Sequence, residues 1–357
     1  MEPTDRRETV WREEGGALEK AQAQPVAAID AGSNTIHLVV ARPEAGRTRL
    51  RALLDDAEMV RLGADVTDIG AIGPERAQRA IAAVRRQLEL ARSLGASEVL
   101  GIATEGVRRA ANAQAFLERV RAETGLRFSL ITGEQEASLA FWGVTSESPE
   151  VDGPRGVIDL GGGSLEFVVG ERDATRWRAS LPLGAGTTRA RLLPTDPPTF
   201  RELIGAYDAL RADLGTLAIP LPVVDVTVSG GTATALATIA GRAFRKHAER
   251  RSSGGDVRAP LVSGQRRALT SATLDALIRL LMRYDADELT RRYRLKVGRA
   301  PLLIAGALTL YAGMERFGVD RMWISHRGIR EGALVAWQRV GDRWLEAATA
   351  GALDAHG

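Results

Sequence analysis

The sequence contains one strand–turn–strand pattern twice, and this repeat constrains the fold more than any other feature. Residues 27–40 read AAIDAGSNTIHLVV and residues 156–169 read GVIDLGGGSLEFVV, and the two align without a gap. In each copy an apolar run ends in an aspartate, a turn of small residues follows, and an alternating apolar pattern resumes. Two such units, 129 residues apart, predict two related domains that face one another.

Both turns of the repeat have a composition that suits phosphate binding. The second turn contains Gly161, Gly162, Gly163 and Ser164, and the first has small or polar residues at the same positions. A glycine turn brings backbone N–H groups close together and lets a bulky anion approach them. A phosphate chain held between the two domains would therefore meet one turn from each side.

Acidic residues flank the turns. Asp30 and Asp159 occupy the same position in the two copies, and seven positions later the first copy has His37 where the second has Glu166. Mg²⁺ is held in proteins by carboxylates together with waters and substrate phosphates, so Asp159 and Glu166 are candidate metal ligands. An aspartate at a strand end is often structural, but its recurrence in both copies favours a functional role.

A third glycine turn follows another apolar strand. Residues 223–228 are expected to form this strand, and Gly230, Gly231 and Thr232 then lead into a helix that reaches Leu236. Because a helix N-terminus presents unpaired backbone N–H groups, this order of strand, turn and helix predicts an anion or nucleotide-phosphate site.

The rest of the chain alternates strands with helices, which predicts an α/β fold of two domains. Residues 59–68 are expected to form a loop, residues 241–267 a mobile segment, and residues 1–24 a disordered leader. The domains are expected at 25–146 and 147–350, and the last helix could pack back on the first domain. The remaining elements expected are helices at 74–93, 112–124, 133–142, 300–311 and 334–347, a hairpin at 26–42, and strands at 49–54, 97–103 and 126–131.

The composition excludes several classes of site. The chain has no cysteine, so it has no disulfide, thiolate metal site or cysteine nucleophile. No apolar run approaches the ~18 residues that span a bilayer, and the charged N-terminus lacks the apolar core of a signal peptide. We therefore expect a cytoplasmic protein without a membrane partner.

The most basic part of the chain is the span 241–299. It contains 15 lysine and arginine residues against 6 acidic residues, although the net charge of the whole chain is only +3. This balance favours an extended polyanion as ligand, and a solvated helix face would explain it equally well. Nucleic acid is disfavoured, because only Phe244, Tyr284 and Tyr293 supply aromatic rings there and no nucleic-acid motif is present.

Two glutamates stand in the first turn of the helix expected at 133–142. Thr132 and Gln135 form a capping-box pattern, and the helix macrodipole favours carboxylates at both Glu134 and Glu136. Each glutamate could be structural, or it could face the substrate and activate water as a general base. The pattern alone does not choose between them.

Two arginines follow the strand expected at 97–103. Arg108 or Arg109 could clamp a phosphate through two hydrogen bonds, and a plain surface arginine would look the same in the sequence. The four histidines lack the spacing of a metal site. Neither the serine-nucleophile elbow nor the Walker-type phosphate loop is present.

Six motifs, in this order and at suitable spacing, resemble the exopolyphosphatase/guanosine pentaphosphate phosphatase (Ppx/GppA) family. They are AAIDAGSNTIHLVVA, ATEGVRRAANAQAFLERV, LITGEQEASLAFWGV, VIDLGGGSLEFVVG, VSGGTATALA and GIREGAL, and the match covers about residues 25–340. The resemblance implies two ribonuclease-H-like domains around a central cleft, as in the superfamily of acetate and sugar kinases, actin and heat-shock chaperone ATPases. The internal repeat agrees with that fold.

The resemblance also implies roles for individual residues. Glu136 falls on the family's catalytic glutamate, which positions the attacking water, and Asp159 and Glu166 fall on acidic residues linked to Mg²⁺ and catalysis. The positions that match phosphate-binding residues of the family are Asp30, Ser33, Asn34 and Thr35 in the first turn, Gly161, Gly162, Gly163 and Ser164 in the second, Gly230, Gly231 and Thr232 in the third, and Arg108.

The sequence departs from the family pattern in three places. The longer members carry a C-terminal helical extension with a metal-dependent phosphohydrolase-like (HD-type) region. This short two-domain form is expected to lack that extension, and therefore to lack tight binding of very long polyphosphate. Glu105 and Gly106 replace a small or polar pair before the arginine motif. Ser138 stands where the family often has arginine, which removes one phosphate contact.

Residues and resemblance together predict a homodimeric hydrolase, dependent on Mg²⁺ or another divalent cation, that removes terminal orthophosphate from shorter chains of inorganic polyphosphate. Hydrolysis of the 5′-γ-phosphate of pppGpp uses the same catalytic set and is the nearest alternative. A non-catalytic sensor of (p)ppGpp or nucleotide is an alternative of another class, opposed by the intact set of Glu136, Asp159 and Glu166. A sugar or acetate kinase is disfavoured by the context of Glu136 and by the lack of a sugar-binding segment.

Overall fold

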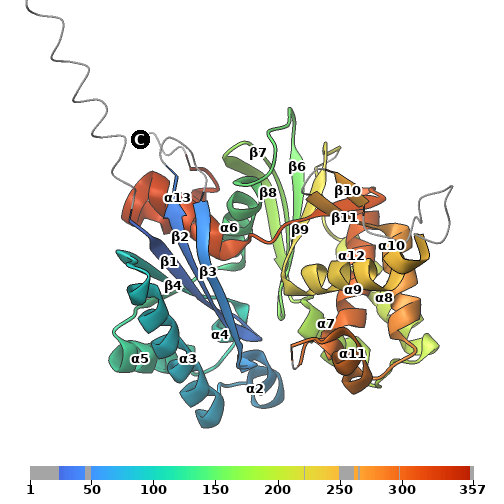
Figure 1. Cartoon of the computed structure of the whole chain (residues 1–357), viewed down its shortest axis with the longest axis horizontal. Helices are drawn as coiled ribbons and strands as arrows, with labels where there is room; N and C mark the ends of the chain where they lie inside the picture. Colours follow the sequence, from blue (N-terminus) through green and yellow to red (C-terminus); the bar gives the residue numbers. More distant parts are fainter. Residues whose placement is uncertain are drawn as a thin grey trace, which may run out of the picture.

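The computed structural model describes residues 24–44, 50–220, 222–248, 261–263, 266–296 and 298–353. The expected leader, apart from Gln24, lies outside these residues, as do residues 249–260 of the expected mobile segment. The described residues form two mixed β-sheets that stand side by side, each with its own helices (Figure 1). None of these helices is long and apolar enough to cross a membrane.

The first sheet has the strand order β3-β2-β1-β4-β5 within the described residues. β1, β2 and β3 pair antiparallel, whereas β4 and β5 run parallel to β1. The expected hairpin and both later strands are confirmed, and β3 is longer than the predicted 49–54. The strands are β1 (Val26–Ala31), β2 (Thr35–Pro43), β3 (Leu50–Met59), β4 (Glu98–Ala103) and β5 (Phe128–Leu130).

The second sheet has the order β10-β11-β12-β9-β6-β7-β8, again within the described residues. The hairpin of β6 and β7 is the second copy of the repeat, and β9 runs parallel to β6 on its other side. The predicted second hairpin and the predicted strand before the third turn are both confirmed. The strands are β6 (Arg155–Leu160), β7 (Leu165–Glu171), β8 (Ala174–Leu181), β9 (Val226–Ser229), β10 (Leu261–Ser263), β11 (Arg266–Thr270) and β12 (Arg321–Ile324).

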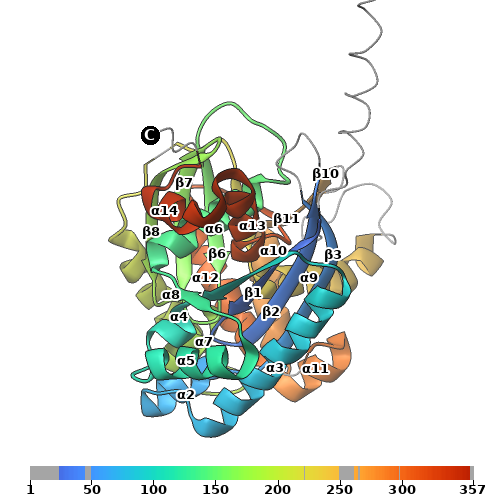
Figure 2. The same ribbon diagram turned by 90° about the vertical axis from the view of Figure 1, so that its left-hand side faces the viewer.

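Helices cover both sheets, and Figure 2 shows α3 and α5 lying across the outer face of the first sheet. The α-helices are α2 (Leu62–Ile69), α3 (Pro74–Ser93), α4 (Glu105–Arg108), α5 (Ala113–Thr124), α6 (Gly133–Thr145), α7 (Ala185–Leu192), α8 (Phe200–Gly215), α9 (Gly231–Ala248), α10 (Ser271–Leu281), α11 (Ala286–Tyr293), α12 (Leu303–Phe317), α13 (Ile329–Val340) and α14 (Trp344–Ala350). The helices predicted at 74–93, 112–124, 133–142 and 300–311 are confirmed, the last with a short 3₁₀ turn before α12.

Strand alternation divides β1 between two hydrophobic cores. Ala27, Ile29 and Ala31 pack in a core that includes residues of α3 and α5, whereas Val26 and Ala28 pack with α6 and α13. This division follows from the period of two along a strand, which sends successive side chains to opposite faces. Both faces of the strand are therefore covered, which explains its nearly continuous apolar sequence.

Helices α6 and α13 lie between the two sheets and join them (Figure 1). Their cluster also contains Val157 of β6 and Val168 of β7, so one apolar core spans both halves. The two helices approach closely, and glycine permits this because it has no Cβ. A Cβ on Gly143 would lie 1.9 Å from the Gly328 carbonyl oxygen, and one on Gly332 would lie 1.8 Å from the Leu139 carbonyl oxygen. This packing fixes both helices relative to the two sheets.

The prediction of a loop at 59–68 is wrong. Strand β3 continues to Met59, and helix α2 then covers most of the stretch. The Gly63 N–H donates to the Ser33 carbonyl over 2.7 Å, and the Asp65 carboxylate accepts from the Gly73 N–H over 2.9 Å and pairs with Arg76. These tertiary contacts outweigh the weak helix propensity of glycine and aspartate.

Two further boundaries differ from the prediction. The single helix expected at 334–347 is two helices, α13 and α14, because Gly341 has a left-handed φ of 59° that ends the first. Part of the segment expected to be mobile is ordered: α9 continues past Leu236 to residue 248, with Ile239 and Ala240 fully buried, and β11 follows later. Burial of one helix face keeps α9 ordered despite the arginines around it.

Candidate active site

A cavity of about 550 Å³ lies between the turns of the two sheets. Its wall brings together all three glycine turns that the sequence singles out. The predicted site residues that line it are Asp30, Ser33, Asn34, Thr35, Glu136, Asp159, Gly161, Gly162, Gly163, Ser164, Gly230, Gly231 and Thr232. Residues from three separate turns therefore line one space, and glycine turns of this kind suit an extended anion.

The first and second turns contact each other. A Cβ on Gly162 would lie 2.1 Å from Nδ2 of Asn34, and a Cβ on Gly163 would lie 2.5 Å from Oγ of Ser33. Side chains at either position would push the two turns apart. The glycines are therefore required by the close approach of two backbones, and not only by the turn itself.

Glu105, one of the departures from the family pattern, bridges this contact. Its Oε2 accepts a hydrogen bond from Oγ of Ser33 over 3.0 Å, and its Oε1 accepts from Nη1 of Arg109 over 3.0 Å. The same Oε2 would lie only 1.6 Å from a Cβ on Gly163. The carboxylate thus packs against both turns, and Arg109 balances its charge.

The structure separates the two glutamates that the local helix pattern could not distinguish. Glu136 is 5% exposed and lines the cavity. Its Oε1 accepts from Oγ of Ser164 over 3.3 Å, and its Oε2 accepts from Nη1 of Arg108 over 3.4 Å. Glu134 has a side chain that is 69% exposed and pairs with Arg178 at 3.5 Å.

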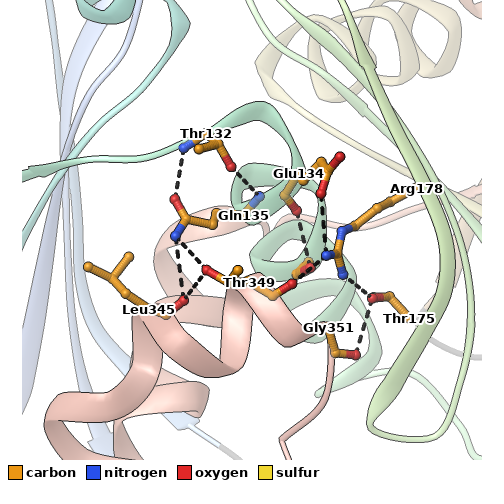
Figure 3. A network of polar contacts seen from close by, with 9 residues as sticks. Thr132, Glu134, Gln135, Thr175, Arg178, Leu345, Thr349 and Gly351 are labelled. Carbon is orange, nitrogen blue, oxygen red and sulfur yellow. Dashed lines mark hydrogen bonds and ion pairs between the residues drawn. The ribbon is translucent and has the colours of Figure 1, made fainter.

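Figure 3 shows how the first turn of α6, which carries Glu136, is fixed. The predicted capping box forms: the Thr132 hydroxyl accepts from the Gln135 N–H over 3.2 Å, and the Gln135 side-chain oxygen accepts from the Thr132 N–H over 2.8 Å. The Gln135 side-chain amide also donates to the Thr349 hydroxyl over 2.9 Å, and Arg178 donates to the Thr349 carbonyl. Helix α14 and strand β8 therefore hold this turn in place.

Two predicted site residues, Arg108 and Glu166, are not among the described residues that line the cavity. Nη1 of Arg108 donates to the Ile131 carbonyl over 2.5 Å as well as to Glu136. Glu166 is fully buried, and its Oε1 accepts from Oγ of Ser180 over 2.8 Å. Its Oε2 has no hydrogen-bond partner in the described part of the chain.

The buried carboxylates of the second hairpin and α6 have raised pKa values. Burial raises the pKa of Glu136 to about 8, Arg108 opposes this shift, and Asp30 and Asp159 add to it by charge repulsion. Burial raises the pKa of Glu166 well above its usual range, and repulsion from Glu136 and Asp159 raises it further. These groups share one region of negative potential.

The two strand-end aspartates, which line the cavity, extend this region. Burial raises the pKa of Asp30 to about 7, and the nearby Arg330 opposes the shift. Burial also raises the pKa of Asp159, whose Oδ1 accepts from Oγ of Ser229 over 2.8 Å, and both that hydrogen bond and Arg330 oppose the shift. Carboxylates that repel one another in a buried site are stabilised by a cation.

The carboxylates suit a divalent cation that shares its coordination with the substrate. Asp159 and Glu166 are paired across β6 and β7, and each has one oxygen held by a serine hydroxyl. Oε2 of Glu166 and Oδ1 of Asp30 are buried without a hydrogen bond among the described residues. In those same residues no three His, Asp or Glu side chains are grouped to hold a metal unaided, so substrate phosphates would complete the shell, as is usual for Mg²⁺.

Comparison with known proteins identifies the chain. The model of the Ppx/GppA phosphatase family matches residues 39–339. The chain belongs to this family. Exopolyphosphatase 1 of Mycobacterium tuberculosis (strain H37Rv) is 33% identical over 309 residues, which are 86% of each protein. The Guanosine-5'-triphosphate,3'-diphosphate pyrophosphatase of Photobacterium profundum is 27% identical over 320 residues, which are 88% of this chain and 60% of that protein.

A solved structure from the family confirms the fold. The crystal structure of the Aquifex aeolicus Ppx/GppA family member matches with a TM-score of 0.70 and 30% identity, over 88% of this chain and 97% of that one. The predicted family and the predicted architecture, ribonuclease-H-like domains of the kinase, chaperone and actin superfamily around a central cleft, are therefore both confirmed.

The cavity of this Ppx/GppA member also has basic residues to which the sequence assigned no individual role. Part of the span 241–299 reaches the wall, while Arg279, in the same span, forms an exposed ion pair with Asp275. The span therefore contains basic residues on the cavity wall as well as an exposed one on a helix face. Arg330 belongs to the sixth motif, GIREGAL, and in the sequence only this motif indicated that it could belong to the site. The basic side chains that line the cavity are Arg242, Arg294, Lys296, Arg299, Arg327 and Arg330.

Proposed function

We propose that this protein is a divalent-cation-dependent exopolyphosphatase, which hydrolyses the terminal phosphoanhydride of inorganic polyphosphate and prefers shorter chains. One observation carries the proposal: Glu136 is a buried carboxylate on the wall of a cavity that glycine turns from both sheets surround. The family and the mycobacterial relative named an exopolyphosphatase support the choice of substrate.

Glu136 acts as the general base. Its carboxylate accepts a proton from water while the water oxygen attacks the terminal phosphorus, and the bond from phosphorus to the bridging oxygen breaks. That oxygen leaves with the shortened chain, and orthophosphate is released. Ser164 and Arg108 hold the carboxylate in place, and the N-terminus of α6 favours its ionised form.

The turns bind the phosphoryl groups. Residues of the first and second turns line the cavity from its two sides, and their backbone N–H groups would bind phosphoryl oxygens there. The side chains of Ser33, Asn34, Thr35 and Ser164 stand beside them. The third turn, with Gly230, Gly231 and Thr232 at the start of α9, binds a phosphate further along the chain.

Asp159 and Glu166 hold the cation. When bound, Mg²⁺ neutralises charge on the transferred phosphoryl group and its leaving oxygen. Ser229 and Ser180 orient these two carboxylates. A cation here also counteracts the repulsion that raises the pKa of Glu136, so the base becomes ionised nearer neutral pH.

Basic residues guide the rest of the polyanion. Arg242, Arg294, Lys296 and Arg299 line the cavity beside the third turn. Nucleic acid is not proposed as a ligand. The domain division at 25–146 and 147–350, a homodimer and a cytoplasmic location are further proposals. The homodimer rests on the resemblance to the family, and the other two rest on the sequence patterns.

The nearest alternative substrate is pppGpp, and the Photobacterium relative supports it. The same base, turns and cation would remove its terminal phosphate. A non-catalytic sensor of (p)ppGpp would not need a buried base at the cavity wall, which favours the enzyme.

The test is phosphate release with Mg²⁺ from short polyphosphate, long polyphosphate and pppGpp in parallel, for the wild type and Glu136→Ala. Release from polyphosphate that the substitution abolishes supports the proposal. Release from pppGpp alone moves the function to that substrate. Binding of (p)ppGpp without release from any substrate contradicts the enzyme and supports the sensor.

A further inference from the structure

Arg330 is a buried cation on the wall of the cavity. It lies in the first turn of α13, is 8% exposed, and lines the cavity together with the glycine turns. Helix α13 packs against β1 and α6, so the backbone that carries Arg330 is fixed. A buried arginine is costly unless it is paired and fully hydrogen-bonded.

The partners of Arg330 within the protein do not satisfy it. Nη1 is buried and makes no hydrogen bond to any described residue. The acidic neighbours are Asp55, 3.9 Å from Nη1, and Glu331, 4.0 Å from Nη2. Charge-assisted hydrogen bonds to carboxylates measure about 2.7–2.9 Å, so both contacts are too long to be such bonds.

Arg330 stands between the two hairpins. Burial raises the pKa of Asp30 at the end of β1 and of Asp159 at the end of β6, and the positive charge of Arg330 opposes both increases. A group that influences both strand ends lies close to the space where the two phosphate-binding turns converge. This is where the last phosphoryl group of a polyphosphate would sit.

Other arginines near the site are already engaged. Nη1 of Arg108 donates to the Ile131 carbonyl and to Glu136, and Arg108 is not among the described residues that line the cavity. Arg327, just before α13, donates to the Leu50 carbonyl over 2.7 Å. Arg330 differs from both, because it combines a place on the wall with an unsatisfied donor.

We propose that Arg330 binds the terminal phosphoryl group of the substrate, and that Arg108 is instead a positioning residue for Glu136. The planar guanidinium donates to two phosphoryl oxygens, which satisfies Nη1 and adds a positive charge where negative charge develops. This inference rests on the proposed function, because it assigns a ligand contact in the same cavity. It changes the role that the sequence motifs imply for Arg108.

Direct binding of inorganic tripolyphosphate tests the proposal without catalysis. Calorimetry with Mg²⁺ would use Glu136→Gln as the parent, with Arg330→Lys, Arg330→Gln or Arg108→Lys added. We expect Kd to rise about tenfold with Arg330→Lys and about thirtyfold or more with Arg330→Gln, the loss of one or two charge-assisted hydrogen bonds. Arg108→Lys should change Kd less than about threefold, but should lower kcat in the Glu136 background.

The matched control is Arg339→Gln, on the same helix, where the arginine forms a surface ion pair with Asp173 at 3.2 Å. Its Kd should stay within about twofold of the parent. Thermal unfolding shows whether each variant is folded, and Arg330→Lys keeps the charge if Arg330→Gln does not fold. Unchanged Kd in a folded Arg330 variant overturns this inference alone, whereas a parent that binds no tripolyphosphate overturns the proposed function as well.

Discussion

The two glycine hairpins have the same backbone and different chemistry. In each, the strand-end aspartate is paired across the hairpin with the residue seven positions later: Asp30 with His37 in the first, Asp159 with Glu166 in the second. The second hairpin therefore presents two carboxylates, and the first presents a carboxylate and an imidazole. Because Mg²⁺ prefers carboxylate oxygens, the second hairpin, with two carboxylates, is better suited to hold it than the first.

The surroundings strengthen the difference. Both carboxylates of the second hairpin accept a hydrogen bond from a serine hydroxyl: Asp159 from Ser229, and Glu166 from Ser180. In the first hairpin His37 contacts Asp55 at 2.5 Å, and burial lowers the pKa of the imidazole, so it is neutral at pH 7. The repeat thus places a turn on each side of the cavity. We propose that only one side provides the cation site and the residue, Ser164, to which the base is hydrogen-bonded.

The largest expected effect concerns that base. Glu136→Gln should lower kcat by about 10³-fold, because general-base catalysis contributes about 10²–10⁴-fold. Glu134→Gln is the matched control in the same helical turn, and its exposed side chain should leave kcat within about twofold. Steady-state kinetics on short polyphosphate decide the matter. An equal decrease of kcat in both variants would show that the effect comes from disturbing the helix turn, and would contradict the role of Glu136 as the base.

The same substitution should stabilise the metal-free protein at high pH. Burial raises the pKa of Glu136 from 4.5 to about 8, so the folded state binds more protons than the unfolded state between these values. Wild-type stability must therefore fall as pH rises through that window, and Glu136→Gln avoids the loss. Denaturant unfolding in chelator should show the variant gaining on the order of 5 kcal/mol over wild type between pH 4 and pH 9. A pH-independent difference would contradict the raised pKa.

The serines offer a milder way to compare the hairpins. Ser180→Ala and Ser229→Ala remove hydrogen bonds to the second-hairpin carboxylates, and each should raise the Mg²⁺ concentration for half-maximal activity about tenfold. His37→Gln, in the first hairpin, should change it less than about threefold. A Mg²⁺ titration of phosphate release measures all three. A larger shift for the histidine variant would contradict the assignment of the cation to the second hairpin.

The smallest effect concerns the contact of α14 with α6. Thr349→Val removes the hydroxyl that accepts from the Gln135 side chain and keeps the shape of the residue. We expect kcat to fall by about threefold with KM unchanged, because the turn that carries Glu136 becomes less fixed while the phosphate-binding turns are untouched. A change in KM alone would show that α14 influences substrate binding and not the base.

Local patterns predicted the hairpins, the turns and the capped helix, because these depend on glycine conformation, strand period and capping residues near in sequence. They missed α2, whose Gly63 and Asp65 are held by Ser33 and Gly73 through tertiary contacts. They also could not separate Glu134 from Glu136. That choice depends on which side of α6 faces β6 and β7.

Two arginines show the same limit within the site. A position after a strand end suggested Arg108 or Arg109 as a phosphate ligand, and the resemblance chose Arg108, whose side chain donates to the Ile131 carbonyl and to Glu136. Nothing local to Arg330 marks it as a cavity residue, because only the packing of α13 between the sheets brings it to both hairpins. Residues contributed by distant segments are therefore the part of a site that sequence patterns miss.

The most direct test of the central claim is the Mg²⁺ dependence of phosphate release in Asp159→Asn and Asp30→Asn, two equivalent substitutions in the two hairpins. We predict that Asp159→Asn raises the Mg²⁺ concentration for half-maximal activity at least about tenfold, and that Asp30→Asn changes it less than about threefold. Equal shifts, or a larger shift for Asp30→Asn, would contradict the assignment of the cation to the second hairpin.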